Sequence, residues 1–199
     1  MDIYEIMSYL SSIYWVLLAI RQSRGNWGWL FLILGLTDML GLLLQSTIGI
    51  YSFRLYLGSS FLMILSLDYK FFDKNKFYLI PLGIALIIPT YYLHHHIINA
   101  ASLFSGIIGF LFFLRKFILL LFKDNKLNFS FLVLSIYFLT GVSKYFVLMS
   151  LDWYGVDLFQ LGNIFQDILM LIFLFIRHDD ERLSINLNRT KENQNSKEP

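Results

Sequence analysis

The 199-residue chain contains no cysteine, and this absence excludes several kinds of chemistry. Without cysteine there is no disulfide framework, no thiolate nucleophile and no cysteine-based metal site. Charged residues are also scarce, at 15% of the chain against about 25% in a typical soluble domain. The net charge of +2 is too small to indicate a nucleic-acid partner. No nucleotide-binding loop is present either, so we expect no cofactor, no metal and no nucleic acid.

Apolar residues are abundant, at 57% of the chain, and aromatic residues reach 18%. Both values are typical of a membrane protein. A membrane-spanning helix needs about 20 mostly apolar residues, with about 17–25 allowed. Seven segments fit this length, and we predict an all-α, polytopic transmembrane helix bundle. The segments run over residues 3–20, 27–49, 52–68, 77–93, 98–122, 129–150 and 156–177.

Proline is rare, with two of the three prolines inside the fourth segment. Pro81 lies in the first turn of that segment, where proline is tolerated. Pro89 is expected to kink the helix or to end it early.

Basic residues collect in alternate loops, which predicts the orientation of the bundle. Fourteen of the sixteen lysines and arginines lie toward the ends of the first, third, fifth and seventh segments or in the stretches that follow them. The positive-inside rule therefore places the N-terminus outside and the C-terminus in the cytoplasm. Trp15 and Trp27 are expected at the inner membrane interface. The predicted localisation is the cytoplasmic (inner) membrane of a bacterium, crossed several times.

The chain divides into two parts by composition. Residues 1–177 are predicted to form one seven-helix transmembrane domain. Residues 178–199 are polar and lack a periodic apolar face, which indicates a short, disordered cytoplasmic tail.

The seventh segment, VDLFQLGNIFQDILMLIFLFIR, carries an unusual number of polar residues. At about 100° per residue, four of them fall within a third of the helix circumference, while Gln166 points elsewhere. The four are Asp157, Gln160, Asn163 and Asp167. A charged residue at the bilayer centre costs ~2.5–3.5 kcal/mol on insertion scales. This stripe should therefore face protein or water rather than lipid.

Two buried aspartates are predicted at similar depths in different helices. Asp38 shares a face of the second segment with Gln45, and Asp167 lies midway along the seventh. If these helices are neighbours, the carboxylates could share a proton, hold a cation or act as general acid and base. The alternative is that each carboxylate is hydrogen bonded to a neighbouring helix and only fixes packing.

Lys144 is the one basic residue expected well inside a segment. It lies roughly level with Gln160, and Asp157 is about one turn further out. An ion pair with Asp157, or contacts with Gln160 and Asn163, would satisfy the ammonium. The alternative is a lysine that extends outward to the interface.

Two further patterns allow more than one interpretation. His94, His95 and His96 are adjacent, so helical spacing makes them a poor chelate, although an irregular loop could present two of them to a metal. A plain interfacial cluster is the alternative. Ala101, Ser105 and Gly109 repeat every four residues in the fifth segment, which indicates close helix packing or a homo-oligomer face.

Known seven-helix families do not match these features. The seventh segment has no lysine for a retinal Schiff base, and the Pro-Gln signature of the SWEET and PQ-loop transporters is absent. GLTDMLGLLLQ is similar to a stretch of the lysoplasmalogenase-like lipid hydrolases, but those proteins have eight helices.

The last third of the chain resembles small, uncharacterised bacterial seven-helix integral membrane proteins. The resemblance rests on NFSFLVLSIYFLTGVSKYFVLM, a tryptophan-containing turn and LFQLGNIFQDILMLIFLFIR. It implies a seven-helix bundle and no particular activity.

The leading functional hypothesis is a non-enzymatic sensory or signal-transmitting membrane module with a separate membrane or cytoplasmic protein partner. It follows from a polar seam in the seventh segment that continues into a basic cytoplasmic tail. The alternatives are an intramembrane lipid enzyme that uses Asp38 and Asp167, and a small-solute or proton-coupled transporter.

Overall fold

The protein is an all-α bundle, seen in a computed structural model that describes residues 3–49, 52–151, 155–180 and 183–187. The described residues form seven α-helices, two short 3-10 helices and one pair of strands. The helices are α1 (Ile3–Gln22), α2 (Gly28–Ile48), α3 (Tyr56–Ser66), α4 (Tyr69–Ala85), α5 (His95–Lys123), α6 (Phe129–Leu151) and α7 (Gly155–Phe175). The 3-10 helices are η1 (Ser52–Leu55) and η2 (Ile88–Tyr91), and the strands are β1 (Lys126–Asn128) and β2 (Ser184–Asn186).

Four helices are long and apolar enough to cross a membrane: α2, α5, α6 and α7. The longest, α5, has 29 residues and is about 43 Å long at 1.5 Å per residue. These helices suit an integral, multi-pass membrane protein. By contrast, α3 has only 11 residues, and α4 is less apolar than the other helices.

The fourth helix differs from the expected segment at residues 77–93. It begins at Tyr69 because Asp68 caps it, accepting a hydrogen bond from the backbone N–H of Phe71 at 3.1 Å. It ends at Ala85, and Pro89 lies in the separate η2. The early end at Pro89 was expected. The prediction for Pro81 was wrong, because this residue lies in the interior of α4 and not in its first turn.

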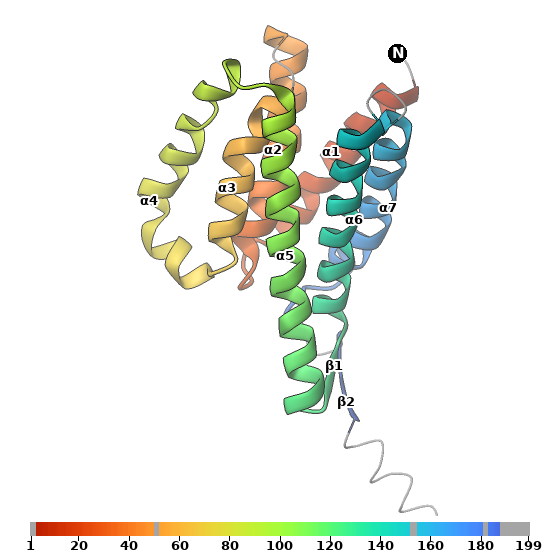
Figure 1. The fold of residues 1–199 in the computed structure, drawn as a ribbon. Helices are drawn as coiled ribbons and strands as arrows, with labels where there is room; N and C mark the ends of the chain where they lie inside the picture. Colours follow the sequence, from red (N-terminus) through yellow and green to blue (C-terminus); the bar gives the residue numbers. More distant parts are fainter. Residues whose placement is uncertain (1–2, 50–51, 152–154, 181–182, 188–199) are drawn as a thin grey trace, which may run out of the picture.

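Successive helices run in alternating directions, so the start of α1 and the β1–β2 pair lie at opposite ends of the bundle (Figure 1). The closest helix pairs are α5 with α6, α1 with α2, and α6 with α7, while α3 and α4 form a hairpin beside α5. Helix α1 also contacts α7. The first and last helices therefore meet within the bundle.

Small residues allow the close contact between α5 and α6. A Cβ atom at Gly109 would overlap the ring of Phe138 on α6, and one at Gly106 would press against Val142. Ser105, in the same seam, is buried. The repeat predicted from the sequence therefore packs within the chain. A homo-oligomer through this face would need α6 to move away, and it stays a prediction.

The first part of the predicted disordered tail is folded. Leu183 is buried, and β2 pairs with β1 in an antiparallel arrangement, with Leu127 opposite Ile185. Leu183 reaches an aromatic core in which Trp27 packs against Phe113. The remainder of the predicted tail, residues 188–199, lies outside the described residues.

Candidate functional site

A polar cavity of about 430 Å³ lies inside the bundle. Side chains of α1, α2, α3, α5, α6 and α7 line it, so most of the molecule contributes to one site. This volume is within the range of about 300–1,000 Å³ that small-molecule sites occupy. Its charged residues are Asp38, Lys144 and Asp167. Its hydroxyl-bearing residues are Ser11, Ser12, Thr37, Tyr56, Ser59, Ser60, Ser102, Ser105, Tyr137 and Tyr145.

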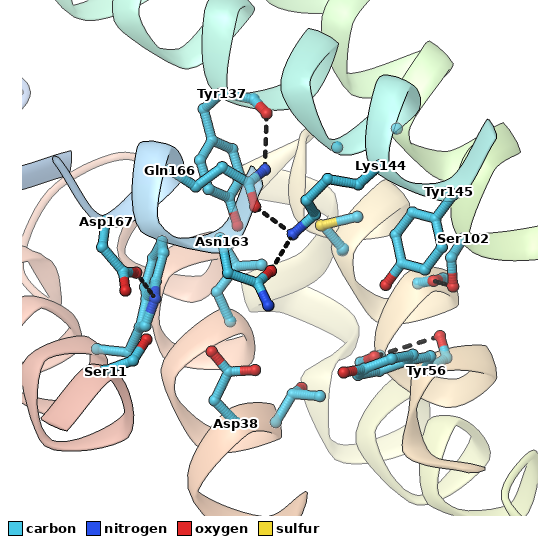
Figure 2. A pocket seen from close by; sticks show the side chains of 18 of the residues that line it. Ser11, Asp38, Tyr56, Ser102, Tyr137, Lys144, Tyr145, Asn163, Gln166 and Asp167 are labelled. Carbon is cyan, nitrogen blue, oxygen red and sulfur yellow. Dashed lines mark hydrogen bonds between the residues drawn. The ribbon is translucent and has the colours of Figure 1, made fainter. Parts of the chain in front are cut away.

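Lys144 occupies one wall of the cavity, where amide oxygens surround its ammonium. It donates hydrogen bonds to Asn163 Oδ1 and to Gln166 Oε1, both on α7 (Figure 2). The amide of Gln166 in turn donates to the carbonyl oxygen of Tyr137 at 2.9 Å. The side-chain amide of Asn163 also donates a hydrogen bond, from Nδ2 to Gln160 Oε1 at 3.2 Å. The ammonium is thus held by a network of neutral amides that links α6 to α7.

Two neighbours complete the surroundings of Lys144. Its Nζ lies 4.8 Å from the ring centre of Phe159, within the range of a cation–π contact. The aliphatic stem crosses α7 at Gly162, where a Cβ atom would overlap it. The lysine therefore points into the bundle and not out to the interface.

Asp167 lies at the α1 side of the cavity. Its carboxylate accepts a hydrogen bond from the indole N–H of Trp15 at 2.8 Å, and Ser11 lies beside it (Figure 2). Trp15 is only 4% exposed. The prediction that Trp15 belongs to the interfacial belt was therefore wrong. A carboxylate in an apolar helix needs a donor, and the indole supplies it inside the bundle.

Asp38 projects into the cavity from α2 (Figure 2). Within the described part of the chain, no side chain or backbone group donates a hydrogen bond to its carboxylate. Lys144 and Asp167 are close enough to act on it electrostatically. The carboxylate of Asp38 is thus available to a bound molecule.

The structure brings together six of the seven predicted site residues. Asp38, Gln45, Lys144, Gln160, Asn163 and Asp167 all line the cavity. Asp157 does not: it is exposed, and the structure contains no Lys144–Asp157 ion pair among its described residues. Of the partners expected for Lys144, Asn163 is a direct one, and Gln160 acts only through Asn163.

Sequence reasoning missed Gln166, Trp15 and the three tyrosines of the cavity. Gln166 was placed away from the polar stripe because a single face of α7 was assumed. In the structure α7 uses two sides, with Gln166 toward α6 and Asp167 toward α1. Adjacent residues of a helix point in different directions, about 100° apart. The polar pair Gln166–Asp167 in an apolar helix was therefore the signal that protein covers two sides of α7.

A second polar cluster joins α1 to the segment after α7. The Gln22 side-chain amide donates to the carbonyl oxygens of Phe173 and Ile176, the latter at 3.1 Å. Its oxygen accepts from the backbone N–H of His178 at 3.0 Å and lies 2.9 Å from His178 Nδ1. Both Gln22 and His178 are buried. This Gln22–His178 clamp fixes the end of α7 against the α1–α2 loop.

The His178 ring is held in its neutral form. Nε2 accepts a hydrogen bond from the backbone N–H of Trp27 at 3.3 Å, which requires an unprotonated nitrogen. The proton then belongs on Nδ1, where Gln22 Oε1 accepts it. Burial lowers the pKa of His178 to about 4, while Asp179 acts to raise that pKa and Arg177 to lower it.

The three adjacent histidines lie at the start of α5, on the outer surface. His94 has an extended backbone and caps the helix, so its ring turns back over the next two residues. The ligand nitrogens of His94, His95 and His96 consequently come within 4.8 Å of one another. Helical spacing alone had predicted a poor chelate, and the non-helical His94 changes this geometry. All three side chains are exposed.

No family model, curated protein or solved structure matches this chain. The similarity of its last third to small bacterial seven-helix proteins therefore stays a prediction.

Proposed function

We propose that the protein is a sensory membrane module that binds a small molecule in its central cavity and transmits the binding through α7. The cavity carries this proposal, because it combines a ligand-sized volume with charged, amide and hydroxyl groups from six helices. Polar side chains inside an apolar bundle are costly and are commonly retained for function.

The proposed membrane arrangement has seven spans, with the N-terminus outside and the C-terminus in the cytoplasm of a bacterium. Helix α1 has 20 residues, and η1 and η2 lengthen α3 and α4. The α1–α2, α3–α4 and α5–α6 connections lie toward the same end of the bundle as β2 (Figure 1). The basic residues in these connections and in the helix turns beside them, together with the positive-inside rule, support a cytoplasmic position for this end.

The signalling part of the proposal rests on α7. Asn163, Gln166 and Asp167 line the cavity from this helix, and two of them hold Lys144. The same helix ends at the Gln22–His178 clamp, from which the chain continues into β2. A ligand that alters the amide network can therefore shift α7 and with it the C-terminal segment that a protein partner would contact.

A second candidate function is an intramembrane lipid enzyme. Asp38 and Asp167 line the same cavity, which is the arrangement that acid–base catalysis by two carboxylates needs. The two residues differ in surroundings, since Asp167 accepts from Trp15 and Asp38 is open to the cavity. Turnover of a bound lipid that is lost in both Asp38→Asn and Asp167→Asn would favour this function.

The test of the sensory proposal uses two labels at the predicted cytoplasmic end. Because the chain has no cysteine, Lys126→Cys and Ile185→Cys introduce unique sites for spin labels on β1 and β2. A panel of amines, sugars, amino acids, nucleosides and single-chain lipids is added to the protein in nanodiscs. We expect at least one compound to raise the melting temperature and to change the distance between the labels.

The matched control compares two acids. Asp38→Asn should abolish both responses, whereas Asp157→Asn should keep them, because Asp157 is exposed and lies outside the cavity. Compounds that stabilise the protein but leave the label distance unchanged would contradict signalling through α7.

A further inference from the structure

An apolar groove of about 340 Å³ lies between α1 and α2, beside the polar cavity. Ile13, Val16 and Leu17 line it from α1, and Met39, Leu42 and Leu43 line it from α2. Ile13 is 60% exposed, Leu17 51% and Leu43 46%, so the groove opens at the outer surface of the bundle. On α1 it extends from Tyr9 to Leu17, or about 12 Å along the helix.

The groove and the cavity share part of their walls. Ser12 on α1 and Leu42 on α2 line both of them. A hydrophobic surface groove thus lies directly against a polar, charged interior, with Ser12 and Leu42 as their shared wall. A molecule that fits both must be apolar at one end and polar at the other, and a groove of about 340 Å³ suits one hydrocarbon chain.

The charges of the cavity indicate the polar end of this molecule. Two carboxylates and one ammonium line the cavity, so its formal charge is negative. The ammonium of Lys144 already has two amide acceptors, and Asp167 accepts from Trp15. Asp38 is the carboxylate left open to the cavity, as far as the described residues extend. A positively charged hydrogen-bond donor would therefore complement it.

The aromatic lining favours the same chemistry. Trp15, Tyr56, Tyr137 and Tyr145 line the space with aromatic rings, and the three tyrosines also bring hydroxyl groups. Ring faces attract ammonium groups, and the attraction is larger where water is excluded.

We propose that the cavity and the groove together bind a single-chain amphiphile with an ammonium head group, the head at Asp38 and the chain between α1 and α2. This inference rests on the proposed function and names the class of ligand for that site. It also gives an entry route, because the amphiphile can pass sideways from the membrane between α1 and α2.

The test uses an octadecylamine that carries a photoreactive diazirine midway along its chain. The full-length protein is placed in phosphatidylcholine nanodiscs, irradiated with this probe and digested, and the labelled peptides are mapped by mass spectrometry. We expect labelling of α1 and α2 at the groove, and competition by unlabelled octadecylamine. The matching octadecanol and octadecyl sulfate probes lack the ammonium, so their labelling of the groove should be weaker by about tenfold or more.

Two pairs of variants test the head and the chain separately. Asp38→Asn should reduce labelling about tenfold, and Asp38→Glu, which keeps the charge, should retain most of it. Leu43→Trp should block the groove, whereas Leu40→Trp should label like the parent protein. Leu40 is a matched control because it lies on the same helix, is also 46% exposed and lines neither space. Unchanged melting temperatures would show that the variants are folded.

The inference is overturned if the amine and alcohol probes label alike, or if Leu40→Trp and Leu43→Trp have equal effects. Its failure can be told apart from failure of the proposed function by the labels on β1 and β2. A soluble compound that changes their distance without groove labelling would contradict the amphiphile alone. Groove labelling with no change in that distance would contradict signalling alone.

Discussion

The Lys144 ammonium lies among neutral oxygen atoms, with the carboxylates of the cavity at longer range. Asn163 and Gln166 accept its hydrogen bonds, and Asp38 and Asp167 interact with it through space. Amide acceptors satisfy the donors of a buried ammonium without neutralising its charge. Residues in this arrangement can respond to a ligand, because a new charge near Asp38 alters the field at Lys144.

Replacing Lys144 by methionine should destabilise the bundle. Lys144→Met keeps an unbranched side chain, one atom shorter, but removes the donors to Asn163 and Gln166, at a cost of about 1–3 kcal/mol. The free energy of unfolding, measured with denaturant in one detergent, checks this value. Lys123→Met, at the exposed end of α5, should change it by less than about 0.5 kcal/mol. Equal effects of the two substitutions would show that the amide network adds no stability.

At the scale of elements, α7 connects the cavity with the β1–β2 pair. Its middle section contacts α6 through Gln166 and α1 through Asp167, and its end is fixed by the Gln22–His178 clamp. Ser130 strengthens this end, since its hydroxyl donates to the carbonyl oxygen of His178 at 2.7 Å. One helix therefore touches both the candidate ligand site and the candidate output.

The clamp should open as the pH falls. The pKa of His178 is about 4 in the folded clamp, below the value of about 6.5 for a free histidine. Because the pKa of His178 is lower in the closed clamp than in the open one, protons bind the open clamp more tightly. The clamp is therefore at full strength above pH 6.5 and weakens progressively between pH 6.5 and 4, by at most about 3 kcal/mol.

Spin labels at Lys126→Cys and Ile185→Cys report the opening of the clamp. We expect their distance distribution to broaden between pH 6.5 and 4 in the parent protein. His178→Gln cannot titrate and should remove this pH dependence. A transition that persists in His178→Gln would have to arise from another group.

At the scale of the whole molecule, the bundle has two chemically different ends. Arg21, Arg24, Lys70, Lys74, Lys123 and Lys126 lie in the connections after α1, α3 and α5 or in the helix turns beside them. The folded C-terminal segment lies at the same end (Figure 1). The three histidines begin α5 at the opposite end. This polarity is what a membrane with two unlike sides requires.

Labelling of single cysteines tests the proposed orientation. A membrane-impermeant maleimide should label Thr47→Cys, at the end of α2, in intact cells. It should label Asp124→Cys, just after α5, only once the membrane has been opened. Both positions are exposed, so access and not burial decides the result. The reverse pattern would place the N-terminus inside.

Composition and periodicity were enough to predict an all-α protein with several membrane-length helices. They located α2, α5, α6 and α7 to within a few residues, because an apolar run of that length has few other structures open to it. The prediction for the fourth helix was shifted because hydropathy does not detect a helix that starts with Asp68 and charged residues. Local capping, and not apolar content, set that boundary.

The sequence by itself determined which polar residues the bundle had to bury, because Asp38, Lys144 and Asp167 could not face lipid. Only the tertiary structure decided how they meet. It placed Trp15 on Asp167 and Gln166 on Lys144, and it set the groove against the cavity at Ser12 and Leu42. A helical pattern gives the face of each residue, whereas partners depend on which helices pack together and at what depth. Lys144 and Gln166 are 22 positions apart in the sequence, and Trp15 and Asp167 are 152 positions apart. Local sequence patterns do not reveal contacts over such separations.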